Sequence, residues 1–420
     1  MIRPTRRCAG LVFVCGVATI VTGAGAAFTA SLLLVLIGAC GVDAMLLRRS
    51  RASGERTLSP TVPLMVASPY SVDVSTEGPA EVRRLRQPAP SEVRLVPDES
   101  DGLALSGEMS GRHRGSYSVG AAVARVSGPL GLTSRDVTVD LSGSVRVIPD
   151  LPRARRLAAA RRRGGGLNDG RVRNRLGVGT DFEAIRDYSP DDDIRQVNWV
   201  ASARTGRPMS NQYRIDENRD VVCLIDTGRL MASPVGEVDR LDVALDAMTI
   251  LCVEAEESQD RVGAIAFSFE VHRQLSPRRY GTAAIVDALY DLETSEVESD
   301  YERAFIAVGR HKRALVVLFS DLVDESASRA LLAACPILTR RHALMVVSCR
   351  DPDLERAIGT APSDTYGVLR TSIAIDLLRT KDRVRFQLES MGVVVVEADA
   401  ERLGSACVRA YFALKARARL

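Results

Sequence analysis

The chain has 420 residues, which is enough for two or three domains with well-packed cores. Its hydrophobic content of 46% and its charged content of 26% are ordinary for a globular protein. The net charge of +3 is too small to indicate nucleic acid as a partner of the whole protein, so we expect no nucleic-acid partner.

Residues 1–50 are predicted to form a transmembrane helical hairpin. Residues 8–47 are almost wholly apolar, and the run is broken at residues 23–25. Because one span needs about 20 helical residues, this length fits two spans, of which the first is short. Arginines flank the run on both sides, which predicts that both ends and all downstream domains are cytoplasmic at the inner or plasma membrane: Arg3, Arg6 and Arg7 precede it, and Arg48, Arg49 and Arg51 follow it.

Three alternatives to the hairpin remain open at this stage. The arginine-rich start and the AGA at 24–26 are typical of a cleaved signal peptide, although a second apolar run follows at once. The IGAC at 37–40 is similar to a lipoprotein box, but it lies deep in the chain. A single tilted span would place the soluble part on the other side of the membrane.

The next 130 residues divide into three segments of different composition. Residues 51–63 are polar and contain proline, which predicts a linker. Residues 64–150 alternate polar and apolar residues in short runs between turn signals, which predicts a small β-sandwich-like module. Residues 151–180 are rich in Arg and Gly, and we expect a connector that is solvated, near anionic lipid headgroups, and at most partly helical.

The segment 181–218 contains the densest cluster of charge in the chain. Its residues 186–204 read RDYSPDDDIRQVNWVASAR and include four aspartates, three arginines and the single tryptophan. Such a cluster either pairs internally through arginine–carboxylate contacts or holds a cation. The number of arginines favours internal pairing, with the Asp run as a possible site for a hard cation.

Residues 219–420 alternate buried-strand runs with helical patterns. VVCLI (221–225) and ALVVLFS (314–320) are such runs, and apolar residues at helical spacing separate most of them. This repetition predicts an α/β fold with a doubly wound, mostly parallel sheet and helices on both faces. Ligands bind at the carboxyl ends of such strands, where Asp226 and Asp321 lie, although an aspartate there is also a routine helix cap.

Recognisable catalytic motifs are absent from the sequence. It contains no phosphate-binding GxxxxGK[ST] loop, no HExxH and no GxSxG. The eight cysteines show no CxxC and no metal spacing with the four histidines, which indicates a reducing compartment. Enzymatic chemistry would therefore depend on carboxylates, and the alternative function is a metal-dependent hydrolase that uses Asp187, Asp191, Asp192, Asp193 and Asp226.

The sequence GTDFEAIRDYSPDDDIRQVNWVASAR, followed by a strand that ends in Asp226, resembles the hallmark of domain-of-unknown-function family 58. RGSYSVGAAVARVSGPLGL (114–132) resembles an upstream segment of that family, with Gly128 where Asp is usual and Leu130 where Phe is usual. The resemblance extends over nearly the whole chain. The motif positions, which we expect to bind a partner, are Arg186, Tyr188, Pro190, Asp191, Asp192, Arg195, Trp199, Ser202 and Arg204, together with Arg229 after the strand.

The resemblance implies a von Willebrand factor A-like domain in 219–420 and a MoxR-type AAA+ ATPase as partner, with a further client protein. It also raises a metal-ion-dependent adhesion site, in which Asp226, Ser299 and Asp321 would hold Mg²⁺. Gly228 and Leu230 replace the two serines of that pattern, so we expect no cofactor, with Mg²⁺ as the alternative. Without a metal, Asp226 would anchor its turn, with Arg229 as counter-ion or partner contact.

These observations predict a non-enzymatic, membrane-anchored adaptor or assembly factor. Trp199 has two interpretations, because Trp, Tyr and Arg are frequent anchors of interfaces but a lone Trp also fills gaps in a core. The sequence favours the second interpretation, in which Trp199 plugs the junction between the motif and the sheet.

Overall fold

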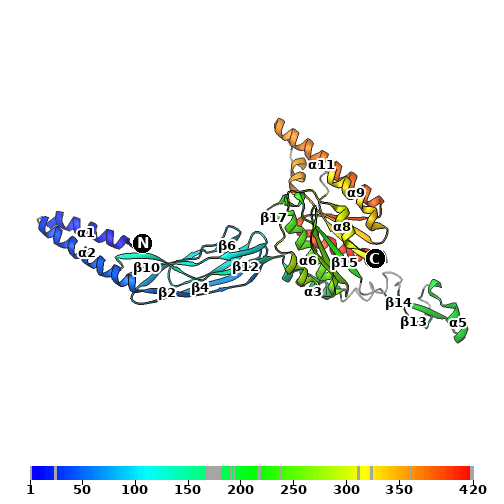
Figure 1. Ribbon diagram of the computed structural model, residues 1–420, viewed down its shortest axis with the longest axis horizontal. Coiled ribbons are helices and arrows are strands. Elements are labelled where there is room, and N and C mark those ends of the chain that lie inside the picture. The colour runs from blue at the N-terminus through cyan, green and yellow to red at the C-terminus, as the bar shows by residue number, and fades with distance from the viewer. Residues whose placement is uncertain are drawn as a thin grey trace. The chain divides into compact units, whose positions relative to one another are not determined.

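A computed structural model describes residues 2–22, 26–165, 181–189, 192, 194–214, 219–236, 238–309, 313–321, 325–359, 361–362 and 364–416. The chain divides into two compact units, Met1–Ile148 and Pro149–Leu420 (Figure 1). The fold is mixed α/β with several sheets, as the sequence predicts.

The first unit begins with strand β1 (Ile2–Pro4) and two helices, α1 (Arg6–Thr22) and α2 (Ala26–Arg49). Of the described helices, α2 alone is long and apolar enough to cross a membrane, over Ala27–Arg49, by length and composition. Helix α1 packs beside it, and Cys8 Sγ lies 3.5 Å from Cys40 Sγ. The structure thus has the predicted pair of helices, with one candidate span instead of two.

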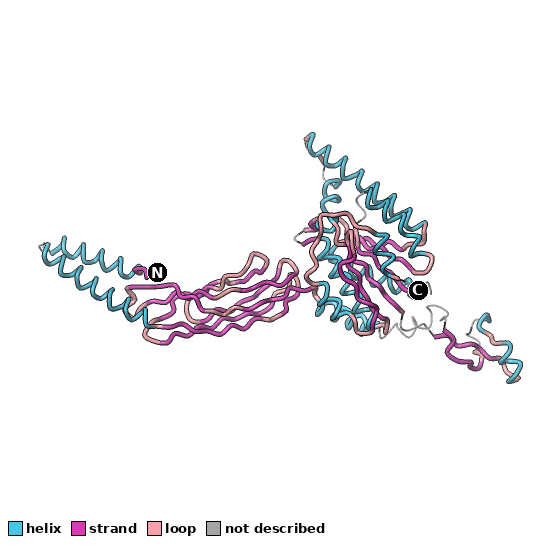
Figure 2. The backbone as a smooth tube through the Cα atoms, in the orientation of Figure 1, coloured by secondary structure: helices cyan, strands magenta, loops and turns pink. Residues whose placement is uncertain are grey.

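The eleven strands that follow α2 form the β module, residues 51–148. Their bounds are β2 (Arg51–Leu58), β3 (Thr61–Pro63), β4 (Ser68–Glu77), β5 (Glu81–Arg86), β6 (Val93–Val96), β7 (Glu99–Ser100), β8 (Ala104–Gly111), β9 (Gly115–Val119), β10 (Ala122–Ser127), β11 (Thr133–Val139) and β12 (Gly143–Ile148). The sheets have the orders β2-β4-β8-β6, β1-β11-β10-β5-β7 and β3-β12-β9. Figure 2 shows strands in magenta and helices in cyan. The prediction of a linker over 51–63 was wrong, because β2 and β3 belong to these sheets.

Alternation along the strands builds the core of the β module. Tyr70, Val72 and Val74 on β4 are buried, whereas the residues between them are less so, because successive side chains of a strand point to opposite faces. Leu47, near the end of α2, is also fully buried in this core. The core of the β module therefore includes the end of α2.

The start of α1 is also fixed to the β module. Strand β1 pairs antiparallel with β11, with Ile2 opposite Arg135 and Pro4 opposite Thr133. The residues before α1 and after α2 are therefore on the same side of the helical pair. A single tilted span that separates the N-terminus from the soluble part does not fit this pairing.

The second unit contains a six-stranded sheet of order β19-β18-β15-β20-β21-β22. Its strands are β15 (Asp220–Asp226), β18 (Arg261–Phe267), β19 (Val271–Arg278), β20 (Ala314–Phe319), β21 (Ala343–Cys349) and β22 (Val394–Ala398). All neighbours pair parallel except β18 and β19, which pair antiparallel. Every residue of β15 is buried, as expected for VVCLI in a sheet that is covered on both faces.

Helices cover both faces of this sheet. They are α6 (Arg240–Glu257), α7 (Thr282–Leu289) and α12 (Ala400–Ala416) on one face, and α8 (Tyr301–Val308), α9 (Glu325–Thr339) and α11 (Thr365–Ser390) on the other; α10 (Pro352–Gly359) precedes α11. Alternate residues of β15 enter the two cores, Val221, Cys223 and Ile225 with α6, and Val222 and Leu224 with α8.

Helix α3 (Leu151–Gly165) corrects the prediction for residues 151–180. It packs on α6 through Ala154 and Ala158, which are buried against Ile250 and Val253. The Arg161 side chain also pairs with Glu254. The first half of the expected connector is therefore a docked helix, and residues 166–180 lie outside the described residues.

Candidate functional site

The carboxyl end of β15 places Asp226 in a buried cluster of hydrogen-bond donors. Its Oδ1 accepts from the backbone N–H of Gly228 at 2.8 Å and from the Ser299 hydroxyl. Its Oδ2 accepts from the Ser320 hydroxyl at 2.5 Å and from the Tyr301 hydroxyl at 3.2 Å. Two donors on each oxygen occupy the usual acceptor positions of a carboxylate.

Burial raises the pKa of Asp226, and the four donors oppose the shift because they favour the ionised carboxylate. Burial likewise raises the pKa of Tyr301 well above its ordinary value, so its hydroxyl stays protonated. Tyr301 and Ser320 extend the predicted pair of Asp226 and Ser299. Ser320 could have been identified from the sequence, because it directly follows the strand run 314–319 and precedes Asp321.

Gly228 provides the space that this cluster needs. A Cβ at position 228 would lie 2.2 Å from the Ser299 hydroxyl oxygen and 3.1 Å from Asp226 Oδ1. The Ser299 hydroxyl therefore occupies the position where the side chain of a serine at 228 would begin. A pocket of about 10 Å³, the size of one water, lies beside the cluster and is lined by Arg229, Leu230 and Glu298.

Arg229 pairs with Glu298. Its Nη2 lies 3.2 Å from Glu298 Oε1, and both side chains are exposed. Arg229 also lines the small pocket beside Asp226. Its two predicted roles, counter-ion of Asp226 and contact with a partner, stay predictions.

Asp321 belongs to a second buried cluster, which contains two cationic side chains. The Arg240 guanidinium pairs with Asp321 Oδ2, and Lys381 Nζ lies 3.4 Å from Asp321 Oδ1. Arg240 also donates to Asp351 at 2.7 Å, and Lys381 lies 3.4 Å from Glu397. Burial of opposite charges at hydrogen-bonding distance fixes these side chains in place.

The residues proposed to bind Mg²⁺ therefore do not fit that ion. Asp226 has its acceptor positions filled by protein donors, and Asp321 is held by Arg240 and Lys381. Mg²⁺ requires near-octahedral oxygen ligands at about 2.0–2.1 Å and loses water reluctantly. The structure brings Asp226 and Ser299 together as hydrogen-bond partners and assigns Asp321 to a different cluster.

Gly228→Ser is expected to destabilise the second unit and not to create a metal site. The new side chain would collide with the Ser299 hydroxyl, and overpacking of this kind costs about 1–3 kcal/mol. Thermal unfolding of the full chain with and without Mg²⁺ measures both effects. Gly228→Ser combined with Ser299→Ala should recover stability, because it removes the colliding oxygen. A Mg²⁺-dependent rise in melting temperature for Gly228→Ser would contradict the expectation.

The motif segment, residues 181–218, forms a separate antiparallel pair. Strands β13 (Asp181–Asp187) and β14 (Met209–Arg214) are joined through the 3-10 turn η1 (Ile194–Gln196) and helix α5 (Trp199–Thr205). Asn198 caps α5, because its side-chain oxygen accepts from Ala201 N–H at 2.9 Å. The Ser202 hydroxyl donates to Asn198 O at 2.7 Å and accepts from Met209 N–H at 2.8 Å. Ser202 is thus a structural residue that joins α5 to β14.

Asp192 confirms internal pairing in part of the motif. Its carboxylate accepts from Ser189 N–H at 2.9 Å and pairs with Arg186. These contacts lower the pKa of Asp192, and the hydrogen bond from the Ser189 backbone N–H has the largest effect. Tyr188 donates to the Asp192 carbonyl at 3.4 Å.

The other motif positions that the structure describes lie on β13, η1 and α5. Asp187 ends β13 and is exposed, Arg195 lies on η1, and Arg204 is exposed in the last turn of α5. Pro190, Asp191 and Asp193 lie outside the described residues.

Trp199 is not a core plug. Its side chain is 71% exposed at the start of α5, with Val200 beside it at 67% and Ile194 on η1 at 68%. The favoured interpretation was wrong because Asn198 and Ser202, instead of the indole ring, fasten α5 to its neighbours. Exposed aromatic and aliphatic side chains in one short segment are a feature of binding surfaces.

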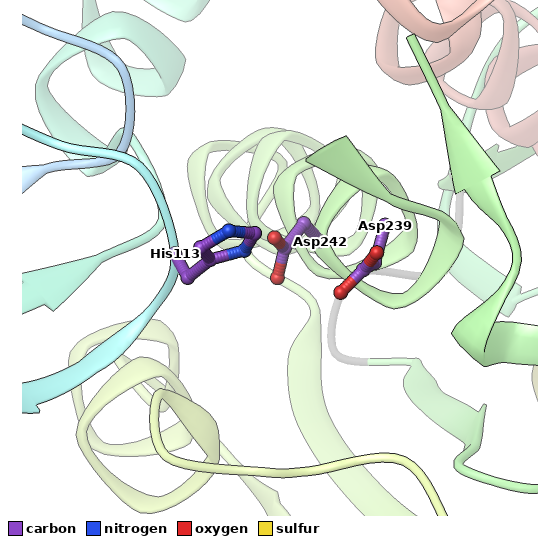
Figure 3. Close-up of side chains that lie close together, drawn as sticks. All are labelled: His113, Asp239 and Asp242. Carbon is purple, nitrogen blue, oxygen red and sulfur yellow. The ribbon is translucent and has the colours of Figure 1, made fainter. Parts of the chain in front are cut away.

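Two acids at the start of α6 do not form a site within the second unit. Asp239 is the N-cap residue, and Asp242 lies in the first turn, where carboxylates complement the helix dipole (Figure 3). His113, the third side chain drawn in Figure 3, belongs to the β module. We therefore assign no metal site to these three side chains.

Comparison with known proteins identifies one family. Residues 184–366 match the model of the family described as "Protein of unknown function DUF58", which supports the resemblance inferred from the motif segment. No curated protein matches the chain.

Two solved structures show low similarity. The first is the CARDB domain of a Pyrococcus furiosus protein, with 14% identity over 23% of this chain and 94% of that domain and a TM-score of 0.15. The second is an uncharacterized membrane-spanning protein from Vibrio fischeri, with 12% identity over 48% of this chain and 100% of that chain and a TM-score of 0.18. With TM-scores this low, neither structure contributes to the assignment of fold or function.

Proposed function

From the family match of residues 184–366 and the geometry of the motif segment, we propose that the protein is a membrane-anchored adaptor or assembly factor and not an enzyme. Its second unit is a von Willebrand A-like domain that binds a MoxR-type AAA+ ATPase and a client protein. The observation that carries the proposal is the exposed surface around Trp199. The mixed sheet with helices on both faces supports the domain assignment.

The surface around Trp199 has the composition of an interface centre. Trp199 and Val200 are exposed at the start of α5, whose backbone is fixed by the contacts of Asn198 and Ser202, and Ile194 is exposed on η1 in the same segment. A rigid frame reduces the entropy lost when the aromatic side chain is buried by a partner. Arg204, in the same helix, adds a second residue type that is enriched at binding hot spots.

The carboxylates give less support to a hydrolase. Asp226 is saturated by four donors and offers no acceptor position for a metal, and Asp192 is engaged by Arg186 and by Ser189 N–H. The hydrolase alternative predicts a divalent-dependent activity that Asp192→Asn abolishes without unfolding the chain. Unfolding by Asp192→Asn would instead favour the structural pairing with Arg186.

A membrane location of the adaptor is supported by its N-terminal helices. Helix α2 is the candidate span, and the ends of α1 and α2 adjoin the same β module. The arginines that flank the helical pair favour the inner or plasma membrane, with the soluble units in the cytoplasm. That location would give the second unit access to a cytoplasmic ATPase.

Trp199→Ala is expected to weaken binding to a MoxR-type ATPase by about 30-fold or more, the typical loss at an aromatic hot spot. Because the side chain is 71% exposed, the stability of the protein should not change. Binding of the full chain to the purified ATPase is measured by surface plasmon resonance, with and without Mg²⁺.

The matched control is Phe386→Ala, which truncates an aromatic side chain on α11 that is 73% exposed. The Phe386→Ala variant should bind the ATPase like the wild type. Mg²⁺ should not change the affinity of the wild-type protein for the ATPase. A nucleotide-free ATPase is used, so that Mg²⁺ acts only through this protein. An equal loss in both variants, or no loss in Trp199→Ala, would refute the role of the motif surface.

A further inference from the structure

The β module contains a basic cavity that the proposed function does not use. Its volume is about 550 Å³, within the range of small-ligand sites, which is about 300–1,000 Å³. It lies beside the start of α1, between the N-terminal residues and the outer face of the sheet that contains β5, β10 and β11. Seven arginines line it: Arg3, Arg6 and Arg7 from the N-terminus, and Arg83, Arg84, Arg125 and Arg135 from the strands.

The strand register explains why so many arginines meet here. Arg125 on β10 lies opposite Arg84 on β5 and Asp136 on β11, so the three side chains share one face. On the next row of the same face, Arg3 on β1 lies opposite Ser134, and Ser134 lies opposite Ser127. On β10 the intervening residues Ala124 and Val126 are buried in the core of the module, whereas on β11 Arg135 points to the same side as these residues and reaches Ser50. The outer face of the sheet therefore carries a cluster of polar and cationic side chains. Solvation of this face alone would not require so many cations.

The acidic residues nearby do not neutralise this face. Arg125 forms two contacts with Asp136, at 2.7 and 3.1 Å, and Arg84 lies 3.4 Å from Asp101. Even with Glu81 and Glu99, which pair with Arg83 and Arg84, the arginines outnumber the acids. Arg135 lies between Ser134 and Asp136 on β11 and donates to the carbonyl of Ser50, so its guanidinium is not counted among the cations of this face.

The frame of the cavity is fixed before any ligand arrives. The Thr5 hydroxyl donates to the Gly131 carbonyl at 2.6 Å, and Thr5 N–H donates to Leu132 O at 2.9 Å. The loop that contains Gly131 and Leu132 is also held by Asp43 of α2, which accepts from Leu132 N–H at 3.0 Å. The arginines at positions 6 and 7 are therefore held beside the strands at the base of the helical pair.

The surface of α1 changes from cationic to apolar next to the cavity. Exposed apolar side chains begin at Leu11 and continue through Phe13 and Val14. At a rise of about 1.5 Å per residue, Leu11 lies only about 6 Å along the helix from Arg7. If the helical pair enters a bilayer, the cavity lies at the depth of the lipid headgroups, where a phosphate group is present at high concentration.

We propose that this cavity binds the phosphate-bearing headgroup of an anionic phospholipid. Arginine suits this ligand because its guanidinium can donate two parallel hydrogen bonds to phosphate oxygens. The acyl chains would lie along the exposed apolar side of α1. The inference rests on the membrane assignment of α2 and is independent of the ATPase partner.

The test uses the full chain in a non-ionic detergent and measures retained lipid by native mass spectrometry. Phosphatidylglycerol is compared with phosphatidylcholine, which has a phosphate but no net charge. The pocket variant is Arg3→Gln with Arg84→Gln, one substitution on each wall. The matched control is Arg94→Gln with Arg112→Gln, which makes the same change in net charge on exposed residues outside the cavity.

The wild type should retain phosphatidylglycerol in preference to phosphatidylcholine. The pocket variant should weaken this binding at least about tenfold, because each basic residue near an anionic lipid surface contributes substantially to affinity. The control pair should bind like the wild type. Arg3→Lys with Arg84→Lys should keep most of the preference, and its unfolding curve shows whether the walls of the cavity tolerate substitution.

Three results would overturn the proposal: equal retention of both lipids, an equal loss in the control pair, or binding of soluble glycerol 3-phosphate as tight as that of the lipid. The last result would identify a free phosphate ester as the ligand. The assay contains no ATPase, so its failure is distinct from a failure of the adaptor function. Extraction of the wild type from cell membranes by detergent, but not by alkaline carbonate, tests the membrane assignment separately.

Discussion

Arg240→Met is expected to lower the free energy of opening of the central strands of the second unit by about 3 kcal/mol or more, the usual cost of breaking a buried ion pair. Arg240 and Asp321 are each only 5% exposed, and Arg240 also donates to Asp351. The substitution leaves the Asp321 carboxylate buried with Lys381 as its remaining cation, at 3.4 Å. Methionine retains much of the side-chain volume, so the loss reports on the charge and not on a cavity.

Hydrogen exchange of the full chain, followed in peptides that cover β15 and β20, measures this change locally and does not require two-state unfolding of both units. Arg229→Met is the matched control, because the Arg229–Glu298 pair is largely exposed and such pairs contribute about 0–1 kcal/mol. The double variant Arg240→Met with Asp321→Leu should recover part of the loss, since it removes both members of the pair and leaves Lys381 with Glu397 at 3.4 Å. An effect of Arg240→Met as small as that of Arg229→Met would contradict the buried-network interpretation.

The wrong grouping of Asp226 with Asp321 has a simple structural cause. Both residues follow parallel strands at the same edge of the sheet, which made them natural partners in the sequence. At the end of β20, however, Ser320 donates to Asp226, whereas the next residue, Asp321, contacts Arg240. Successive residues of an extended chain point to opposite sides, so only one of the two can reach Asp226.

Sequence patterns predicted the strands of the fold well where the apolar residues follow a single regular pattern. The alternation of Tyr70, Val72 and Val74 and the continuous apolar run 221–225 each correspond to a strand of the expected kind. The docking of helix α3 was missed because its arginines suggested a solvated, at most partly helical connector, whereas the small residues Ala154 and Ala158 allow close packing on α6. Composition alone does not distinguish these outcomes.

The residues missed at the candidate site have partners far away in the chain. Arg240 is 81 residues from Asp321 and 111 residues from Asp351. Nothing in the local sequence around Arg240 or Lys381 distinguishes them from surface cations. Trp199 shows the reverse case, because a residue type that is usually at least half buried is exposed where polar side chains already fix the backbone.

Asp43→Ala is expected to release the end of α2 from the β module. Asp43 is fully buried and accepts from Leu130 N–H at 2.8 Å, from Leu132 N–H at 3.0 Å, and from both the N–H and the hydroxyl of Thr133 at 2.8 Å. Hydrogen bonds to a charged acceptor contribute about 1.5–3 kcal/mol each, and buried donors that lose their partner add a penalty. Since water can partly replace the carboxylate, we expect a local loss of at least about 3 kcal/mol.

Gly128 shows how closely this contact is built. A Cβ at position 128 would lie 2.3 Å from Asp43 Oδ1, so the loop can approach the carboxylate only because residue 128 has no side chain. Gly128 is one of the two positions at which the segment 114–132 differs from the family pattern that it resembles. Asp43 of α2 thus fills the space beside Gly128 and joins the helical pair to residues 130–133.

The measurement is hydrogen exchange of the loop 128–133, with limited proteolysis of the same loop as a second readout. Asp43→Asn should lose most of the protection, because the amide keeps one acceptor oxygen and presents an NH₂ group to the remaining donors. Asp73→Ala, an exposed aspartate on β4, is the control and should leave the loop unchanged. Because the same loop holds Gly131 and Thr5 at the wall of the basic cavity, Asp43→Ala should also reduce lipid retention. Unchanged protection of the loop in Asp43→Ala would show that the helical pair and the β module are held together by other contacts, of which the burial of Leu47 is the first to test.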